Sequence, residues 1–467
     1  MLHLRDYQSD SVGKIRQAYL ASKRAPLLVL PTGGGKTVVF SHIAAATSSR
    51  SKRVLVLVHR VELLRQTSDA LHKSDVDHGL INPMFTPDYK KAVQVASVQT
   101  IVKRLHYVKA PDLIVIDEAH HATAGTWRKI LDHFPSALVL GVTATPIRGD
   151  GNGLGIESGG IFDELVEGPQ VYELIQRRFL VQPAVYAPTE RIDMSGVKIV
   201  RGDYDNKEVV ARVDKPVITG SAVAHYAKLC PGTPAVVFCA SVAHAQHVAD
   251  EFRSAGFKSY AVDGSMDDDI RKRILAGLGN GQVEVVTSCD LISEGTDIPA
   301  IGCAILLRPT QSLGLYLQQV GRALRVCEGK DRAIILDHVG NVLTHGMPDE
   351  HRYWSLDGEE KRKKRKKDEE PPVKVKQCTN CYAVHAPAPA CPHCGFIYQN
   401  DKKIDVQEGE LQQITPEQAQ ALKRQRAREV AQAQTYEQLE QIAKARGYKP
   451  GWAKHIWQSR QERTPQY

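Results

Sequence analysis

The sequence lacks long hydrophobic runs, because none of its apolar stretches approaches the roughly 18 residues of a membrane-spanning helix. Residues 1–6 also lack the apolar segment of a secretion signal, and charges come early there. Charge of one sign does not dominate, since 61 Lys and Arg against 53 Asp and Glu leave a net charge of +8. We therefore expect no membrane association, and the modest positive charge is compatible with a polyanionic partner without establishing one.

The composition that is present fits a globular protein of several domains. Hydrophobic residues make up 42% of the chain and charged residues 24%. A length of 467 residues exceeds what one core supports, so about three domains are expected. Five of the nine cysteines are scattered through apolar or mixed sequence, and the other four cluster near the C-terminus. This distribution favours a reducing, cytoplasmic setting. The scattered five are Cys230, Cys239, Cys289, Cys303 and Cys327.

A glycine-rich turn stands between an apolar run at 27–30 and an expected helix at 38–44. Its glycines leave backbone N–H groups free to face phosphates, and the helix that follows directs its positive end to the same place. Lys36 can then reach the β- and γ-phosphates of ATP, and the Thr37 hydroxyl can ligate Mg²⁺. Pro31 replaces the usual first glycine, and a merely flexible turn is the alternative. The expected phosphate-binding residues are Thr32, Gly33, Gly34, Gly35, Lys36 and Thr37.

Two adjacent acids end the apolar run at 113–116. Asp117 can hold Mg²⁺, and Glu118 can orient and deprotonate the attacking water. A purely structural interpretation would have to explain two neighbouring acids at the tip of a buried strand without a cation. Near the start of the chain, the Gln8 amide suits the edge of an adenine and Arg5 could support the same base. For these two residues alone, a polar surface helix is the simpler interpretation.

These motifs together resemble the superfamily 2 helicases, of the DNA-directed kind that bears a DEAH box. The resemblance is carried by Gln8, the turn at 31–37, the Asp-Glu-Ala-His run at 117–120 and the Thr-Ala-Thr-Pro run at 143–146. It implies an α/β fold with two tandem RecA-like parallel-sheet domains and ATP bound between them. It also implies that the second half contains motifs of its own.

The second half contains two such motifs. An apolar run at 283–288 leads into residues 289–299, which match the helicase motif between nucleotide and nucleic acid. There Gly295 allows close backbone approach, and Asp297 can meet the ribose or position an arginine. The other motif, at 318–325, reads Gln-Gln-Val-Gly-Arg-Ala-Leu-Arg.

The two arginines of the second motif, Arg322 and Arg325, lie three apart and share one face of a helix. Arginines that arrive on domain closure stabilise the transition state, by a factor on the order of 10³–10⁵. We count Gln318 with them among the catalytic candidates. A solvated basic helix face is the alternative.

The C-terminal region begins with a charge block at 361–370, interpreted as a solvated linker or a phosphate tether. Two Cys-x-x-Cys pairs follow, nine residues apart, and this spacing favours tetrahedral Zn²⁺. So small a module lacks a core, and metal binding worth about 10–16 kcal/mol would fold it. A redox disulfide pair and an iron–sulfur cluster are the alternatives. The four expected ligands are Cys378, Cys381, Cys391 and Cys394.

The last part of the chain is expected to be helical, and residues 446–457 interleave aromatic with basic side chains. These aromatics could stack on bases, or they could pack the terminal helices together. A helicase core followed by four cysteines and a Gly-Tyr-Lys-Pro-Gly-Trp-Ala run resembles the bacterial RadD (YejH) group and its phage relatives. That resemblance implies a role in DNA repair or recombination.

We therefore expect an ATP-dependent helicase or translocase with ATP, Mg²⁺ and Zn²⁺ as cofactors. Its partner would be single-stranded or forked DNA, bound with low sequence specificity; single-strand-binding or recombination proteins are further candidates, and a monomer is expected. The alternatives are an ATP-gated scaffold that remodels DNA without separating strands, a motor subunit of a restriction-type complex, and an RNA helicase. The expected layout is an ATP-binding domain (1–165), a connecting helix and insertion (166–218), a C-terminal helicase domain (219–345), a charged linker (346–372), a zinc ribbon (373–400) and a helical tail (401–467).

Overall fold

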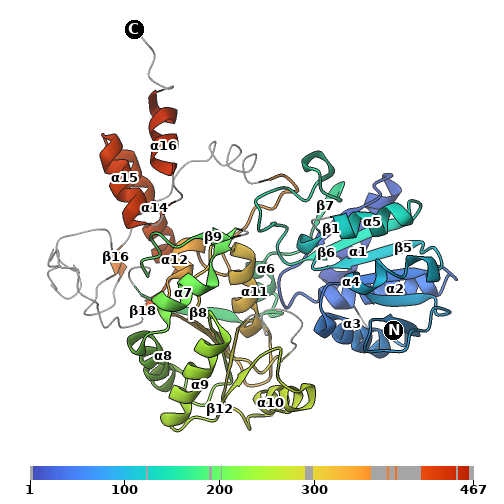
Figure 1. Ribbon diagram of the computed structural model, residues 1–467, viewed down its shortest axis with the longest axis horizontal. Helices are drawn as coiled ribbons and strands as arrows, with labels where there is room; N and C mark the ends of the chain where they lie inside the picture. The colour runs from blue at the N-terminus through green and yellow to red at the C-terminus, as the bar shows by residue number, and fades with distance from the viewer. Residues whose placement is uncertain are drawn as a thin grey trace.

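The computed structural model describes most of the two expected helicase domains and part of the tail. The described residues are 4–122, 125–188, 192–200, 202–289, 298–358, 376–377, 384–385, 412–446, 448 and 451–461. Gly295, Asp297 and the charge block lie outside them, as do Cys378, Cys381, Cys391 and Cys394. Figure 1 shows two α/β bodies beside each other, with the last helices projecting from the second body.

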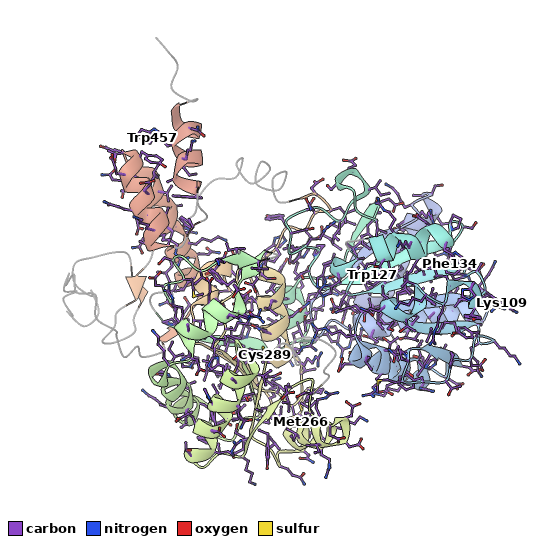
Figure 2. All side chains as sticks on the ribbon, viewed as in Figure 1. Lys109, Trp127, Phe134, Met266, Cys289 and Trp457 are labelled. Atoms are coloured by element: carbon purple, nitrogen blue, oxygen red, sulfur yellow. The ribbon has the colours of Figure 1, made fainter. Side chains whose placement is uncertain are left out.

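The first body contains a seven-stranded parallel sheet in the order β3-β4-β2-β5-β6-β1-β7. Its central strands are Val-, Leu- and Ile-rich and are buried along their length, because helices cover both faces. In Figure 2, Trp127 and Phe134 are labelled on this body, where both are buried. The strands are β1 Pro26–Val29, β2 Val54–Val58, β3 His78–Ile81, β4 Val93–Ser97, β5 Leu113–Asp117, β6 Leu138–Thr143 and β7 Glu164–Glu167; the helices are α1 Asp6–Leu20, α2 Lys36–Ser48, α3 Val61–Lys73, α4 Val98–Ile101 and α5 Gly125–His133.

The second body contains another seven-stranded sheet, in the order β12-β13-β11-β14-β15-β8-β18, in which only the edge strand β18 is antiparallel. A two-stranded hairpin, β9 Ile199–Val200 and β10 Asp203–Tyr204, stands apart from it. The strands are β8 Gln182–Ala187, β11 Ala235–Phe238, β12 Ser259–Val262, β13 Val285–Ser288, β14 Cys303–Leu306, β15 Arg332–Asp337 and β18 Gln412–Ile414; the helices are α7 Asn206–Val213, α8 Pro216–Leu229, α9 Val242–Ser254, α10 Asp268–Asn280, α11 Leu313–Ala323 and α12 Asn341–His345. Helix α6, Val171–Gln176, lies in the chain between β7 of the first sheet and β8 of the second.

The expected fold class of two parallel-sheet α/β domains is confirmed. Three segments lie elsewhere than the expected layout suggests. Strand β8 comes from the region expected to be a connection. Strand β18 comes from the expected tail. Part of the expected linker returns to the first body, where Leu154 and Gly155 donate backbone hydrogen bonds to the Leu356 carbonyl at 2.9 and 3.0 Å.

The tail contains a docked helix and a small helical unit. Helix α14, Pro416–Gln432, packs Ala419 and Leu422 against the core of the second body. Helices α15, Tyr436–Ala445, and α16, Trp452–Gln461, form a core of their own that includes Leu439 and Trp457. The terminal aromatics therefore pack helices together, as one of the two interpretations expected. Among the described residues, no helix combines the length and apolar character needed to cross a bilayer.

Candidate functional site

The glycine turn runs from β1 into α2, and its backbone requires glycine at two positions. Gly33 and Gly35 have φ angles of +85° and +81°, in the left-handed region that side chains disfavour. A Cβ at Gly35 would also clash with the Gln8 side chain. The turn therefore delivers Lys36 as the first residue of α2.

Helix α1 supports this turn from one side. Gln8 is 3% exposed; its Nε2 donates to the Gly34 carbonyl at 3.3 Å, and its Oε1 accepts from the Arg5 backbone N–H at 3.0 Å. Tyr7 Oη donates to the same Gly34 carbonyl at 3.0 Å. Gln8 thus binds the turn itself, and Tyr7 is a contact that the sequence analysis missed.

The two acids stand at the end of β5, opposite the turn. Asp117 and Glu118 are 5% and 7% exposed. Glu118 Oε1 lies 3.8 Å from Lys36 Nζ, and the Glu118 backbone N–H donates to Asp117 Oδ1 at 2.9 Å. A cation and two buried carboxylates thus face one space, the arrangement that a metal–triphosphate complex requires.

A line of polar contacts leads from Glu118 to the second body. His120 Nδ1 lies 3.4 Å from Glu118 Oε2 and 2.9 Å from Thr143 Oγ1. Thr143 Oγ1 donates to the Thr145 carbonyl at 3.1 Å. Thr145 Oγ1 lies so close to α11 that a Cβ at Gly314 would be 2.9 Å from it. The acids are therefore connected, through the two threonines, to α11, which contains Arg322. The expectation that both arginines share one helix face is wrong: Arg325 lies two residues beyond the end of α11, where it bridges with Leu180.

Helix α11 lies directly against the glycine turn. A Cβ at Gly321 would clash with Thr32, so only glycine permits this approach. Arg322 is 5% exposed and lines the same cavity as Lys36, and Arg325 lines it too. Gln318, one turn earlier, is 3% exposed and does not line the cavity; within the described part of the chain its Nε2 has no hydrogen-bond partner.

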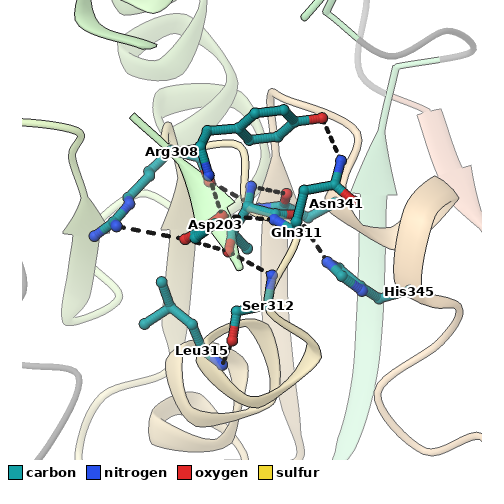
Figure 3. Close-up of polar contacts among 9 residues, drawn as sticks. Asp203, Arg308, Gln311, Ser312, Leu315, Asn341 and His345 are labelled. Carbon is teal, nitrogen blue, oxygen red and sulfur yellow. Dashed lines mark hydrogen bonds and ion pairs between the residues drawn. The ribbon is translucent and has the colours of Figure 1, made fainter. Parts of the chain in front are cut away.

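The loop before α11 is held by the β9–β10 hairpin, the insertion to which the sequence analysis gave no role. Asp203 accepts hydrogen bonds from Thr310 Oγ1 at 2.8 Å and from the Gln311 backbone N–H at 2.7 Å (Figure 3). Ser312 then caps the helix, its Oγ accepting from the Leu315 backbone N–H at 3.2 Å. The hairpin thus fixes the start of the arginine helix.

The resulting cavity, of about 380 Å³, lies between the two bodies. It brings together most of the expected site residues. Gly34 lies beside it through its bonded carbonyl, while Gly295 and Asp297 are outside the described residues. Phe179 also lines the cavity, and no motif marks it in the sequence. The expected residues that line the cavity are Arg5, Gln8, Thr32, Gly33, Gly35, Lys36, Thr37, Asp117, Glu118, Arg322 and Arg325.

Two ion pairs cross between the bodies near this cavity. Arg65 Nη1, on α3, lies 2.6 Å from Asp268 Oδ2 at the start of α10. Arg271 Nη2 lies 3.5 Å from Glu62 Oε1 and also pairs with Asp268. The hydrogen bond from Arg65 lowers the pKa of the Asp268 carboxyl below its usual value. Both pairs join α3 to α10, and α3 also contributes Leu63 to the cavity wall.

Two family models match the chain. Residues 1–148 match the model described as type III restriction enzyme, res subunit, and residues 221–327 match the helicase conserved C-terminal domain. The first match lies within the first body and the second within the second body.

Individual proteins resemble the chain over most of its length. A 51.5 kDa protein of a Lactococcus phage is 34% identical over 392 residues, which are 83% of this chain and 82% of that protein. The candidate ATP-dependent helicase IRC3 of Saccharomyces cerevisiae is 31% identical over 72% of this chain, which spans only 51% of the yeast protein.

A solved fragment of a candidate type I restriction HsdR subunit from Vibrio vulnificus has the same fold. It superposes with a TM-score of 0.58 at 23% identity, over 75% of this chain and 67% of that one. The phage protein shares 34% identity with the chain over most of both, the restriction-enzyme res-subunit model matches the first body, and the helicase conserved C-terminal model matches the second. With the yeast relative named as a helicase, these matches identify the chain as a superfamily 2 helicase, an enzyme that hydrolyses ATP.

Proposed function

We propose that this chain is an ATP-dependent DNA helicase or translocase that hydrolyses ATP between its two sheets to move along or remodel DNA. The observation behind the proposal is the shared cavity, where Lys36 and Glu118 from the first body face Arg322 and Arg325 from the second. A site divided in this way is complete only when the bodies meet, so the nucleotide can govern their approach.

Six side chains of the cavity, together with the backbone of the turn, have roles in the proposed reaction. Lys36 and the N–H groups of the turn bind the phosphates. Thr37 and Asp117 would hold Mg²⁺, which neutralises phosphate charge when bound. Glu118 orients the attacking water and accepts its proton. Arg322 and Arg325 stabilise the charge of the transition state.

The path from chemistry to movement passes through α11. Its close contacts with Thr32 and Thr145 mean that a shift of the turn or of the acids displaces the helix. Since α11 is fixed to the second body through the Asp203 contacts, that body moves with it. DNA lying across both bodies would then be displaced in each cycle, held mainly by its phosphates.

To test this proposal, ATP hydrolysis is measured for the native chain and for Lys36→Ala. Each is assayed without nucleic acid and with single-stranded DNA, duplex DNA, forked DNA or RNA. We expect DNA to stimulate the native chain and the variant to lose turnover at least about 100-fold, because Lys36 is the one lysine among the described residues that line the cavity. Lys73→Ala, at the exposed end of α3, is the matched control. Turnover retained in Lys36→Ala would refute the site, and a preference for RNA would refute DNA as the partner.

A motor subunit of a restriction-type complex is a second candidate, favoured by the restriction-enzyme model that matches residues 1–148. It requires a separate nuclease, because we find no nuclease constellation in the tail sequence. A strand-displacement assay on forked DNA separates unwinding from translocation or remodelling alone, and nuclease activity that co-purifies would favour the restriction role.

We extend the proposal in three finer points that rest on the sequence. The order of helicase core, four cysteines and terminal motif supports a repair or recombination role like that of the RadD group. Single-strand-binding or recombination proteins would then be partners of a monomeric enzyme. Cys378, Cys381, Cys391 and Cys394 would hold one Zn²⁺ in a structural module.

A further inference from the structure

Three consecutive residues lead from the first body into the second sheet, and the first of them, Phe179, lines the nucleotide cavity. Phe179, Leu180 and Val181 connect α6 to β8. The Val181 backbone N–H donates to the Leu324 carbonyl at 2.9 Å, and Leu180 forms an isolated antiparallel bridge with Arg325. The connection is therefore paired, through its backbone, with the two residues that follow α11.

The same connection contacts the glycine turn. Leu180 is 2% exposed, and a Cβ at Gly33 would lie 2.9 Å from its Cδ2 and 3.4 Å from Arg325 Cγ. Leu180 and Arg325 thus pack side by side against the phosphate loop. A displacement of Leu180 must change the place of Arg325, because packed interiors leave no slack.

Phe179 lies on the side of the cavity where Arg5 and Gln8 stand. The Arg5 guanidinium carbon is 4.5 Å from the centre of the Phe179 ring, and the Tyr7 ring is 5.1 Å from it. A guanidinium stacked on an aromatic ring is held in one plane, and its second face suits a planar base. The Gln8 amide already forms hydrogen bonds with Arg5 and Gly34. Stacking on Arg5 is therefore a better way for this site to hold a base than hydrogen bonds to Gln8.

We propose that Phe179 is a positioning residue for the nucleotide base: it holds Arg5 against the base and, through Leu180, makes the place of Arg325 depend on base binding. The inference rests on the proposed nucleotide site and extends it. It assigns a sensing role to the connection between the bodies. Binding of the base, which lies away from the phosphates, would supply the energy that orders Arg325.

This coupling has two measurable consequences. Ligands with a base should lose affinity when Phe179 is truncated, whereas a ligand with phosphates alone should not. At saturating ATP, turnover should fall as well, because Arg325 is then less well ordered. A purely structural role for Phe179 would weaken both kinds of ligand equally.

The experiment compares Phe179→Ala and Phe179→Trp with the native chain in DNA-stimulated ATP hydrolysis, using ADP and inorganic pyrophosphate as competitive inhibitors. For Phe179→Ala we expect KM for ATP and the inhibition constant of ADP to rise about tenfold, the worth of one stacking contact. The inhibition constant of pyrophosphate should stay within twofold, and kcat should fall several-fold. Phe179→Trp should restore KM, the inhibition constant of ADP and kcat, since indole offers a larger stacking face.

Phe257→Ala, which truncates a partly buried phenylalanine in the core of the second body, is the matched control and should leave both inhibition constants unchanged. Equal weakening of ADP and pyrophosphate, or unchanged ADP binding, would overturn the base-positioning role. An unchanged kcat would overturn the coupling to Arg325. Lys36→Ala separates the two levels: if it retains turnover, the nucleotide site itself is wrong, whatever Phe179 does.

Discussion

Glu118 stands in a backbone conformation that few residues other than glycine adopt, with φ at +45°. Such strain persists only where the surroundings impose it, and it clusters at functional sites. Here the turn from β5 directs the carboxylate between Lys36 and His120. The strained position thus belongs to the acid that the sequence proposed as the general base.

We expect Glu118→Gln to lower ATP turnover about 10²–10⁴-fold, because an amide cannot accept the proton of the attacking water. ATP and DNA binding should persist, since the side chain keeps its size and neither Lys36 nor the turn is altered. Single-turnover hydrolysis and binding of labelled ATP measure the two effects. Glu251→Gln, exposed on α9, is the control. Normal hydrolysis in Glu118→Gln would remove the residue's role as base.

The residues that sequence could predict are those defined by a local run. Asp117 and Glu118 stand at the end of an apolar strand, whereas Lys36 and Thr37 follow the glycine turn and begin α2. The structure brings all four to one cavity. Phe179 could not be found in this way, because its contact with Arg5 depends on how the chain crosses between the bodies. The same limit applies to the Tyr7 contact with the glycine turn.

Among the elements, strands made of β-branched and leucine runs could be predicted, whereas β8 and β18 could not. Pro183 makes β8 hard to predict, because proline is rare inside strands that are paired on both sides. Strand β18 is short and polar, and its partner lies more than two hundred residues earlier in the chain. Their pairing is decided by an open sheet edge and not by their own sequence. The contact of α3 with α10 is equally non-local, although both helices could be expected.

We expect the ion pairs between α3 and α10 to contribute electrostatically to closure of the cleft between the bodies. We expect Arg65→Ala and Asp268→Ala each to raise KM for ATP about two- to fivefold at low salt, in line with at most about 1 kcal/mol for a partly exposed pair. The double variant should cost no more than either single variant, because all three lack the same interaction. Salt should erase the difference, since it screens exposed charges.

The control for this cycle is Lys272→Ala, whose ion pair with Asp269 lies within α10 and does not cross the cleft. Its KM should match that of the native chain. Strictly multiplicative effects of Arg65→Ala and Asp268→Ala would show that the two side chains act independently and that the pair does not hold the bodies together.

Across the whole molecule, the two bodies are joined by more than the nucleotide cavity. After α12 the chain returns to the first body, where Arg352 and Gln170 exchange hydrogen bonds at 2.9 and 3.2 Å. Further on, β18 completes the second sheet. The cysteine region therefore lies in sequence between two segments that contact different bodies.

Within that region the structure describes a small antiparallel pair, β16 Lys376–Gln377 with β17 Val384–His385. The first Cys-x-x-Cys pair, Cys378 and Cys381, stands in the sequence between these two strands. A two-stranded hairpin is marginal in water without further support, and a metal bound by four thiolates supplies it. We therefore expect about one Zn²⁺ per chain.

Elemental analysis of the purified chain measures the metal, and Cys378→Ser should lower its content because a tetrahedral site loses one of four ligands. Cys327→Ser, which replaces an exposed free cysteine of the second body, should leave it unchanged. Visible absorbance with bound iron would indicate a cluster in place of zinc. The opposite outcome is a folded, metal-free chain in which mass spectrometry finds both cysteine pairs oxidised. That result would show that disulfides stabilise this hairpin and that zinc does not.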